Sequence, residues 1–176
     1  LDDAVASYHK ALAIKPDFAN AHSNLGNVLR ELGKLDEAVA SYHKALAIKP
    51  DLAEIHNNLG VALQELGKLD EAVASYRKAL AIKPDYAEAH NNLANVLLAQ
   101  GRSIDAVASY QKALSIVPDD AETHANLGIA LHELDRLEDA EASYRKALAL
   151  DPDYARAHTS LGTTLQETGR LDEAVA

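Results

Sequence analysis

The sequence predicts an all-α protein, an α-solenoid (superhelix) in which antiparallel helix-turn-helix units repeat every 34 residues. Three residue types keep this spacing along the chain: five prolines, five tyrosines and five histidines. They are Pro16, Pro50, Pro84, Pro118 and Pro152; Tyr8, Tyr42, Tyr76, Tyr110 and Tyr144; and His22, His56, His90, His124 and His158. A fixed period of this length is the sequence signature of a repeat architecture.

The first half of each repeat is predicted to be a helix that ends at a glycine turn. In residues 19–52, Leu25, Leu29 and Leu32 recur at steps of four and three, which places them on one helical face. Gly33 follows directly, and glycine tolerates the positive φ that is common just past a helix C-terminus. Asp135 stands at the equivalent position of the fourth repeat, where we expect it to strain the turn.

The second half of each repeat is predicted to be another helix. Leu35, Val39, Tyr42 and Leu46 form its apolar face, and Pro50 ends it. One hairpin cannot cover its own apolar faces, so neighbouring hairpins are expected to stack and share a core.

Three of the first helices are further predicted to begin with a capping box in which aspartate is the cap. Asp51 is followed three residues later by Glu54, and Asp85/Glu88 and Asp119/Glu122 repeat this arrangement.

The repeat pattern resembles the tetratricopeptide repeat (TPR). The matching residues in 19–52 are His22, Leu25-Gly26, Leu29, Gly33, Ala38, Tyr42, Ala45 and Pro50. The resemblance implies one array over 1–176, with full repeats at 19–52, 53–86, 87–120 and 121–154. Residues 1–18 would be the second helix of an earlier repeat, and 155–176 a first helix with the start of a second. Histidine replaces the family's usual tryptophan, and Ala94 replaces a glycine.

Composition excludes several classes of function. The net charge of −10 opposes binding to nucleic acid or to anionic membranes, both of which rely on Lys and Arg. The absence of cysteine excludes thiolate metal sites and a cysteine nucleophile. No phosphate-binding loop, GxSxG or HExxH motif is present, so we expect no catalytic residue, metal or cofactor. The histidines of the 34-residue grid are interpreted as core residues, and a cytoplasmic location is only a default.

A stripe on the first helices is the predicted binding site, and in TPR proteins this stripe lines the concave groove. Asn24, Asn58, Asn92 and Asn126 hold the same position in consecutive repeats, and Ser160 ends the row. An Asn amide offers a donor and an acceptor, so the row can grip a peptide backbone of any sequence. The predicted peptide-binding residues are Asn24, Asn27, Asn58, Asn92, Asn95, Asn126, Glu54, Glu88 and Glu122. The run resembles the asparagine ladder of O-linked N-acetylglucosamine transferase and also bacterial TPR arrays.

The resemblance leaves three functions open. The first is a scaffold for protein–protein interaction that binds extended polypeptide, neutral to basic because the stripe carries seven glutamates and one arginine. The second is a substrate-recruiting arm of a larger enzyme, such as a glycosyltransferase, whose catalytic domain lies outside this sequence. The third is end-to-end self-association through exposed terminal hairpin faces.

Overall fold

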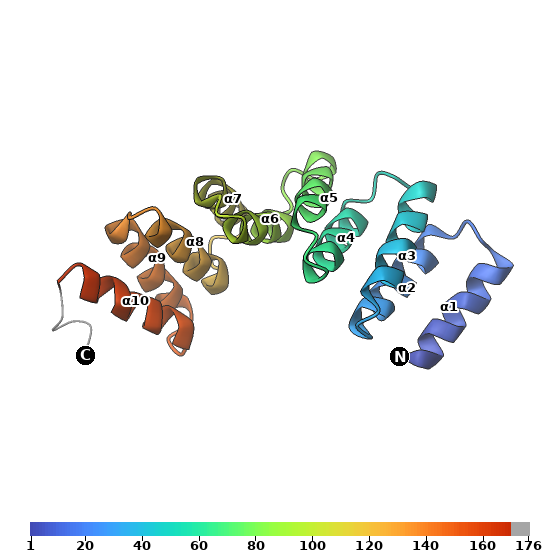
Figure 1. The fold of residues 1–176 in the computed structure, drawn as a ribbon, viewed down its shortest axis with the longest axis horizontal. Coiled ribbons are helices and arrows are strands. Elements are labelled where there is room, and N and C mark those ends of the chain that lie inside the picture. The colour runs from blue at the N-terminus through green and yellow to red at the C-terminus, as the bar shows by residue number, and fades with distance from the viewer. Residues whose placement is uncertain (170–176) are drawn as a thin grey trace. The chain divides into compact units, whose positions relative to one another are not determined.

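A computed structural model describes residues 1–169, and within them all regular secondary structure is helical (Figure 1). The helices are α1 (Asp2–Ile14), α2 (Ala19–Glu31), α3 (Leu35–Ile48), α4 (Ala53–Glu65), α5 (Leu69–Ile82), α6 (Ala87–Ala99), α7 (Ser103–Ile116), α8 (Ala121–Glu133), α9 (Leu137–Leu150) and α10 (Ala155–Glu167). The predicted all-α solenoid of helical hairpins is confirmed. The start of a second helix after α10 was expected within 170–176, which lies outside the described residues.

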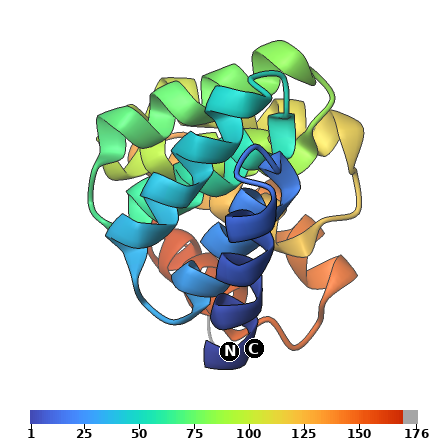
Figure 2. The same ribbon diagram turned by 90° about the vertical axis from the view of Figure 1, so that its right-hand side faces the viewer.

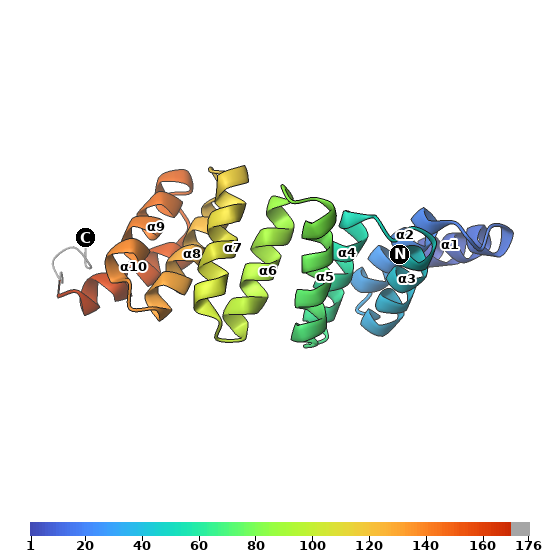
Figure 3. The same ribbon diagram turned by 90° about the horizontal axis from the view of Figure 1, so that it is seen from above.

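The chain forms two units, residues 1–84 and the residues from 85 onward. In the first unit, α2 pairs with α3 and α4 with α5, while α3 packs on α4 and α1 lies against α2 (Figure 2). In the second unit, α6 pairs with α7 and α8 with α9, and α10 packs on α9 (Figure 3). Each predicted full repeat therefore contains one helical hairpin. No helix of the described part of the chain is long and apolar enough to cross a membrane.

Close contact between a glycine and a tyrosine joins the two helices in three of the four full hairpins, α2–α3, α4–α5 and α8–α9. The Tyr42 side chain is 0% exposed, and a Cβ built on Gly26 would lie 2.6 Å from its Cε1 atom. Gly60 and Gly128 face Tyr76 and Tyr144 in the same way. Ordinary contacts between carbon atoms are about 3.5–4.0 Å, so the aromatic ring can approach α2 this closely only because the side chain of Gly26 is missing.

The turn inside each hairpin follows the predicted glycine geometry. Gly33 has φ +73°, and the backbone N–H of Lys34 donates to the carbonyl oxygen of Leu29 at 2.9 Å. This bond spans the turn and closes a Schellman-type helix end. Asp135 has φ +57°, the left-handed conformation that costs an L-residue free energy. The strain expected at Asp135 is therefore present in the backbone.

The prediction of aspartate capping boxes is wrong. The carboxylates expected as caps, Asp51, Asp85 and Asp119, each lie one residue before the cap position. Leu52 and Tyr86 occupy that position in α4 and α6 and make no side-chain capping bond. In α8 the cap is Asp120, whose Oδ1 accepts the backbone N–H groups of Glu122 at 3.1 Å and Thr123 at 3.3 Å.

The histidines of the 34-residue grid tie each first helix to the loop before it. The Nε2 atoms of His22 and His56 lie 2.9 Å from the carbonyl oxygens of Pro16 and Pro50. A carbonyl oxygen only accepts, so each imidazole donates through Nε2–H. His22 and His56 are buried as expected, whereas His158 makes the same bond at 2.8 Å but is exposed, so the core interpretation is wrong for it. Within residues 1–169 no group of three or more acidic or histidine side chains is placed to hold a metal ion.

Candidate functional site

The first unit brings four of the predicted binding residues to one cavity. Asn24 and Asn27 of α2, together with Glu54 and Asn58 of α4, line a cavity of about 500 Å³. Ile82 and Lys83, at the C-terminal end of α5, also line it. Ile82 is 39% exposed, so an apolar surface borders a cavity that otherwise has several side-chain amides. The cavity therefore offers hydrogen bonds and an apolar contact in one place.

A shared acceptor orients the amides of this cavity. The Tyr42 hydroxyl donates to Asn27 Oδ1 at 2.8 Å, and Asn58 Nδ2 donates to the same oxygen at 3.1 Å. Asn27 Oδ1 therefore accepts two hydrogen bonds, one inside its own hairpin and one from the next. Asn58 still has a second N–H and its carbonyl oxygen, which are the groups a peptide backbone would use.

The second unit contains the same arrangement, in which one asparagine oxygen lies close to both a tyrosine hydroxyl and an asparagine amide nitrogen. We call this arrangement the asparagine brace. Tyr110 donates to Asn95 Oδ1 at 2.5 Å, and Asn126 Nδ2 lies 3.4 Å from the same atom. Asn126 is only 5% exposed, so it is less open to a ligand than Asn58, which is half-buried. Asn92 is also half-buried and already has interactions within the protein.

The hydroxyls that make the braces stay protonated at neutral pH. Burial raises the pKa of Tyr42 to about 12, although the nearby Arg30 opposes this shift. Burial likewise raises the pKa of Tyr110 and of Tyr144. A protonated phenol can donate a hydrogen bond, so Tyr42 and Tyr110 keep fixing the amides of Asn27 and Asn95.

The brace is absent from the second and fourth repeats, because an apolar residue replaces its accepting asparagine there. Val61 and Ile129 stand at the positions equivalent to Asn27 and Asn95. Tyr76 donates instead to Gln64 Oε1 at 3.0 Å. Analysis of the sequence missed this role of Asn27 and Asn95, although their recurrence at 68 residues, twice the repeat length, was the available signal.

Carboxylates accompany the amides on the first helices. Glu54, Glu88 and Glu122 are all exposed. Glu122 also lines a cavity of about 510 Å³ in the second unit, together with Asp119, Asp120 and Asp151. A ligand at the first-helix face of either unit therefore meets negative charge.

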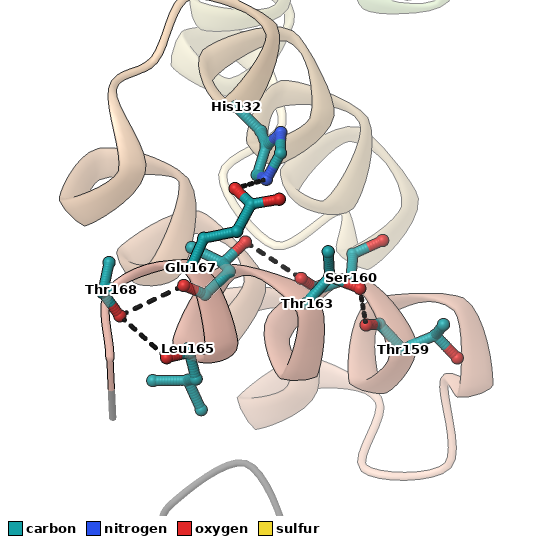
Figure 4. Close-up of polar contacts among 8 residues, drawn as sticks. His132, Thr159, Ser160, Thr163, Leu165, Glu167 and Thr168 are labelled. Atoms are coloured by element: carbon teal, nitrogen blue, oxygen red, sulfur yellow. Dashed lines mark hydrogen bonds and ion pairs between the residues drawn. The ribbon is translucent and has the colours of Figure 1, made fainter. Parts of the chain in front are cut away.

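Polar contacts between side chains also join consecutive first helices, a feature that the sequence analysis missed. Arg30 Nη1 of α2 lies 3.6 Å from Glu65 Oε1 of α4. His132 Nε2 of α8 lies 2.9 Å from Glu167 Oε2 of α10 (Figure 4). Both pairs are 35 residues apart, one more than the repeat length, so the spacing was the signal that could have found them.

Family models for repeats of one kind match along the chain. A model described as TPR repeat matches residues 1–29, 26–67 and 64–101. Two models described as tetratricopeptide repeat match residues 85–153 and 143–176. No curated protein matches the sequence.

Several solved structures are similar to this chain. The crystal structure of MamA is 25% identical, with 89% of this chain and 86% of that chain covered and a TM-score of 0.84. YrrB, described as a TPR protein with an unusual peptide-binding site, is 23% identical over 95% of this chain and 86% of its own, with a TM-score of 0.82. PilF of Pseudomonas aeruginosa is 24% identical over 96% and 77%, with a TM-score of 0.84. At such identities YrrB and PilF show a shared fold.

Proposed function

The chain belongs to the tetratricopeptide repeat family, and we propose that it binds extended polypeptide on its first-helix face as a non-catalytic scaffold. The TPR fold supports a role in protein–protein interaction. The proposed contacts are the asparagines and glutamates predicted from the sequence. YrrB is described as having a peptide-binding site, but it is similar in fold alone, so the proposal rests on the residues of this chain.

One observation carries the proposal: Asn24, Asn58 and Glu54 line a single cavity with Asn27. Asn27 orients the Asn58 amide, and preorganised groups lose less conformational entropy when a ligand binds. An extended peptide presents alternating N–H and C=O groups, which match a side chain that can both donate and accept. Contacts to the backbone would make binding tolerant of ligand sequence.

The proposed partner is neutral to basic. Glu54 lines the first-unit cavity, and Glu122 lines an acidic cavity in the second unit. Complementary charge raises association rates and rejects partners of like charge. At low salt, acidic peptides should therefore bind more weakly than neutral or basic peptides. This difference in affinity should shrink as added salt screens the exposed charges.

The test is a peptide-array screen followed by anisotropy titrations of the best binders. The Asn24→Ala/Asn58→Ala variant should weaken binding by about thirtyfold, since two neutral hydrogen bonds contribute about 1 kcal/mol each. Gln111→Ala is the matched control, because it removes an exposed amide from α7 and leaves the first helices unchanged. The proposed site would be wrong if both variants lost the same affinity for peptide. It would also be wrong if the double variant kept its affinity and its melting temperature.

A further inference from the structure

The asparagine row ends at Ser160, and a small cavity opens there. The cavity has a volume of about 200 Å³ and lies among residues of α8, α9 and α10. Ser160 is shorter than the asparagine of earlier repeats, and Ile129 replaces the amide found at Asn95. Pockets for drug-sized ligands have volumes of roughly 300–1,000 Å³, so this cavity suits a single side chain.

The cavity has an apolar part formed by two side chains. Ile129 is half-buried, and Tyr144 is 2% exposed with its side chain lining the cavity. Burial raises the pKa of the Tyr144 hydroxyl, and the Ser160 side chain beside it lowers that pKa. An occupant would therefore pack carbon atoms against Ile129 and the Tyr144 ring.

The polar atoms around the cavity are mainly acceptors. The Thr159 hydroxyl donates to the carbonyl oxygen of Ala155 at 3.0 Å, and the Thr163 hydroxyl donates to that of Thr159 at 3.1 Å. Each hydroxyl has only one hydrogen, so both oxygens are left to accept. Glu133 also lines the cavity, and one of its oxygens accepts from Ser103 at 2.6 Å.

The imidazole of His132 also lines the cavity, and its Nε2 atom lies close to Glu167. His132 Nε2 lies 2.9 Å from Glu167 Oε2, which is outside the cavity lining (Figure 4). The lining therefore combines an apolar surface with threonine and carboxylate oxygens that need donors.

We propose that this cavity is a subsite for a lysine side chain of the bound polypeptide. This proposal deepens the proposed function and rests on it. An ammonium group has three donors and no acceptor, which complements Glu133, Thr159 and Thr163. The four-carbon stem would cover Ile129 and the Tyr144 ring while its charged end reaches the carboxylate. Within the second unit, the asparagine row would hold the backbone of the ligand, and this cavity would select one residue of it.

The test uses two peptides of alternating glycine and serine that differ at one residue, lysine or norleucine. The wild-type protein should bind the lysine peptide about fivefold more tightly, the effect of roughly one partly exposed charge pair. Glu133→Gln and Ser160→Asn should each reduce this ratio to near one. Ser160→Asn restores the asparagine of the other repeats, so it should fold normally.

Glu31→Gln is the matched control, because Glu31 holds the position of Glu133 in the first unit and changes the net charge equally. Its ratio should equal that of the wild type. The subsite is overturned if the wild-type protein binds the lysine and norleucine peptides equally well. It is also overturned if Glu133→Gln and Ser160→Asn keep the wild-type preference for the lysine peptide.

A second measurement separates the subsite from the asparagine row. The Ile129 methyl resonance should shift at about fivefold lower concentrations of N-acetyl-lysine methylamide than of the norleucine compound, which keeps the alkyl stem but lacks the ammonium group. An unmoved Ile129 methyl resonance would overturn the subsite, even if Asn58→Ala weakens binding of the norleucine peptide. If neither peptide depends on Asn58 while the Ile129 resonance shifts with the lysine compound, the proposed function fails and the lysine cavity stands.

Discussion

The Tyr42 ring occupies the space that a side chain at Gly26 would need, since a Cβ there would lie 2.6 Å from Tyr42 Cε1. The Gly26→Ala variant should therefore destabilise the protein by about 1–3 kcal/mol through overpacking. Urea denaturation followed by circular dichroism measures this change. The third repeat shows that the ring position can adjust, because Ala94 and Tyr110 are both 0% exposed there.

Gly162 provides the control for Gly26. It lies inside α10, and no described atom outside its own helix segment comes within 4 Å of a Cβ built on it. The Gly162→Ala variant should stabilise the protein by about 0.5–1 kcal/mol, since alanine is the better helix former. A similar loss of stability in both variants would show that the Tyr42 contact is not the cause.

Replacing Asp135 by glycine should stabilise the turn between α8 and α9. Asp135 has φ +57°, whereas Gly33, Gly67 and Gly101 adopt values of +72° to +74° at the equivalent turns. Asp135→Gly should raise the free energy of unfolding by about 0.5–1 kcal/mol, because the left-handed region strains residues that have a Cβ. The reverse change, Gly101→Asp, should lower it by a similar amount in the same urea titration. An unchanged midpoint for both variants would contradict this account.

The sequence predicted those features that depend on spacing along one helix. Gly33 and Pro50 marked where helices end, and the apolar residues between them marked the packed faces. Capping at Asp51 was mispredicted because a shift of one residue in the helix start moves the carboxylate out of reach. The link from Asn58 to Asn27 joins residues 31 apart, so it depended on how neighbouring hairpins pack.

A buried carboxylate in α9 should be replaceable by an apolar side chain. Glu141 is 5% exposed and pairs with Arg145, while Val73 and Val107 fill the equivalent buried positions in α5 and α7. Removing a charge from water is costly, so Glu141→Val should leave stability unchanged or raise it by about 1 kcal/mol. Arg145→Gln should lower stability because it removes a partner of the buried charge. Thermal unfolding of both variants at neutral pH measures these effects, and a large loss in Glu141→Val would refute the interpretation.

Stability should fall at alkaline pH because of the buried tyrosines. Burial raises the pKa of Tyr42 from its ordinary value of 10.0 to about 12. Between these values the unfolded chain loses the phenolic proton while the folded protein keeps it, so unfolding becomes easier as pH rises. Below pH 10 this contribution is constant. The free energy of unfolding, measured by urea titration at intervals from pH 8 to 11.5, should therefore decline above pH 10. Tyr42→Phe should start from lower stability, having lost the bond to Asn27, but decline less steeply. Equal slopes in the variant and the wild type would show that Tyr42 does not contribute to the decline.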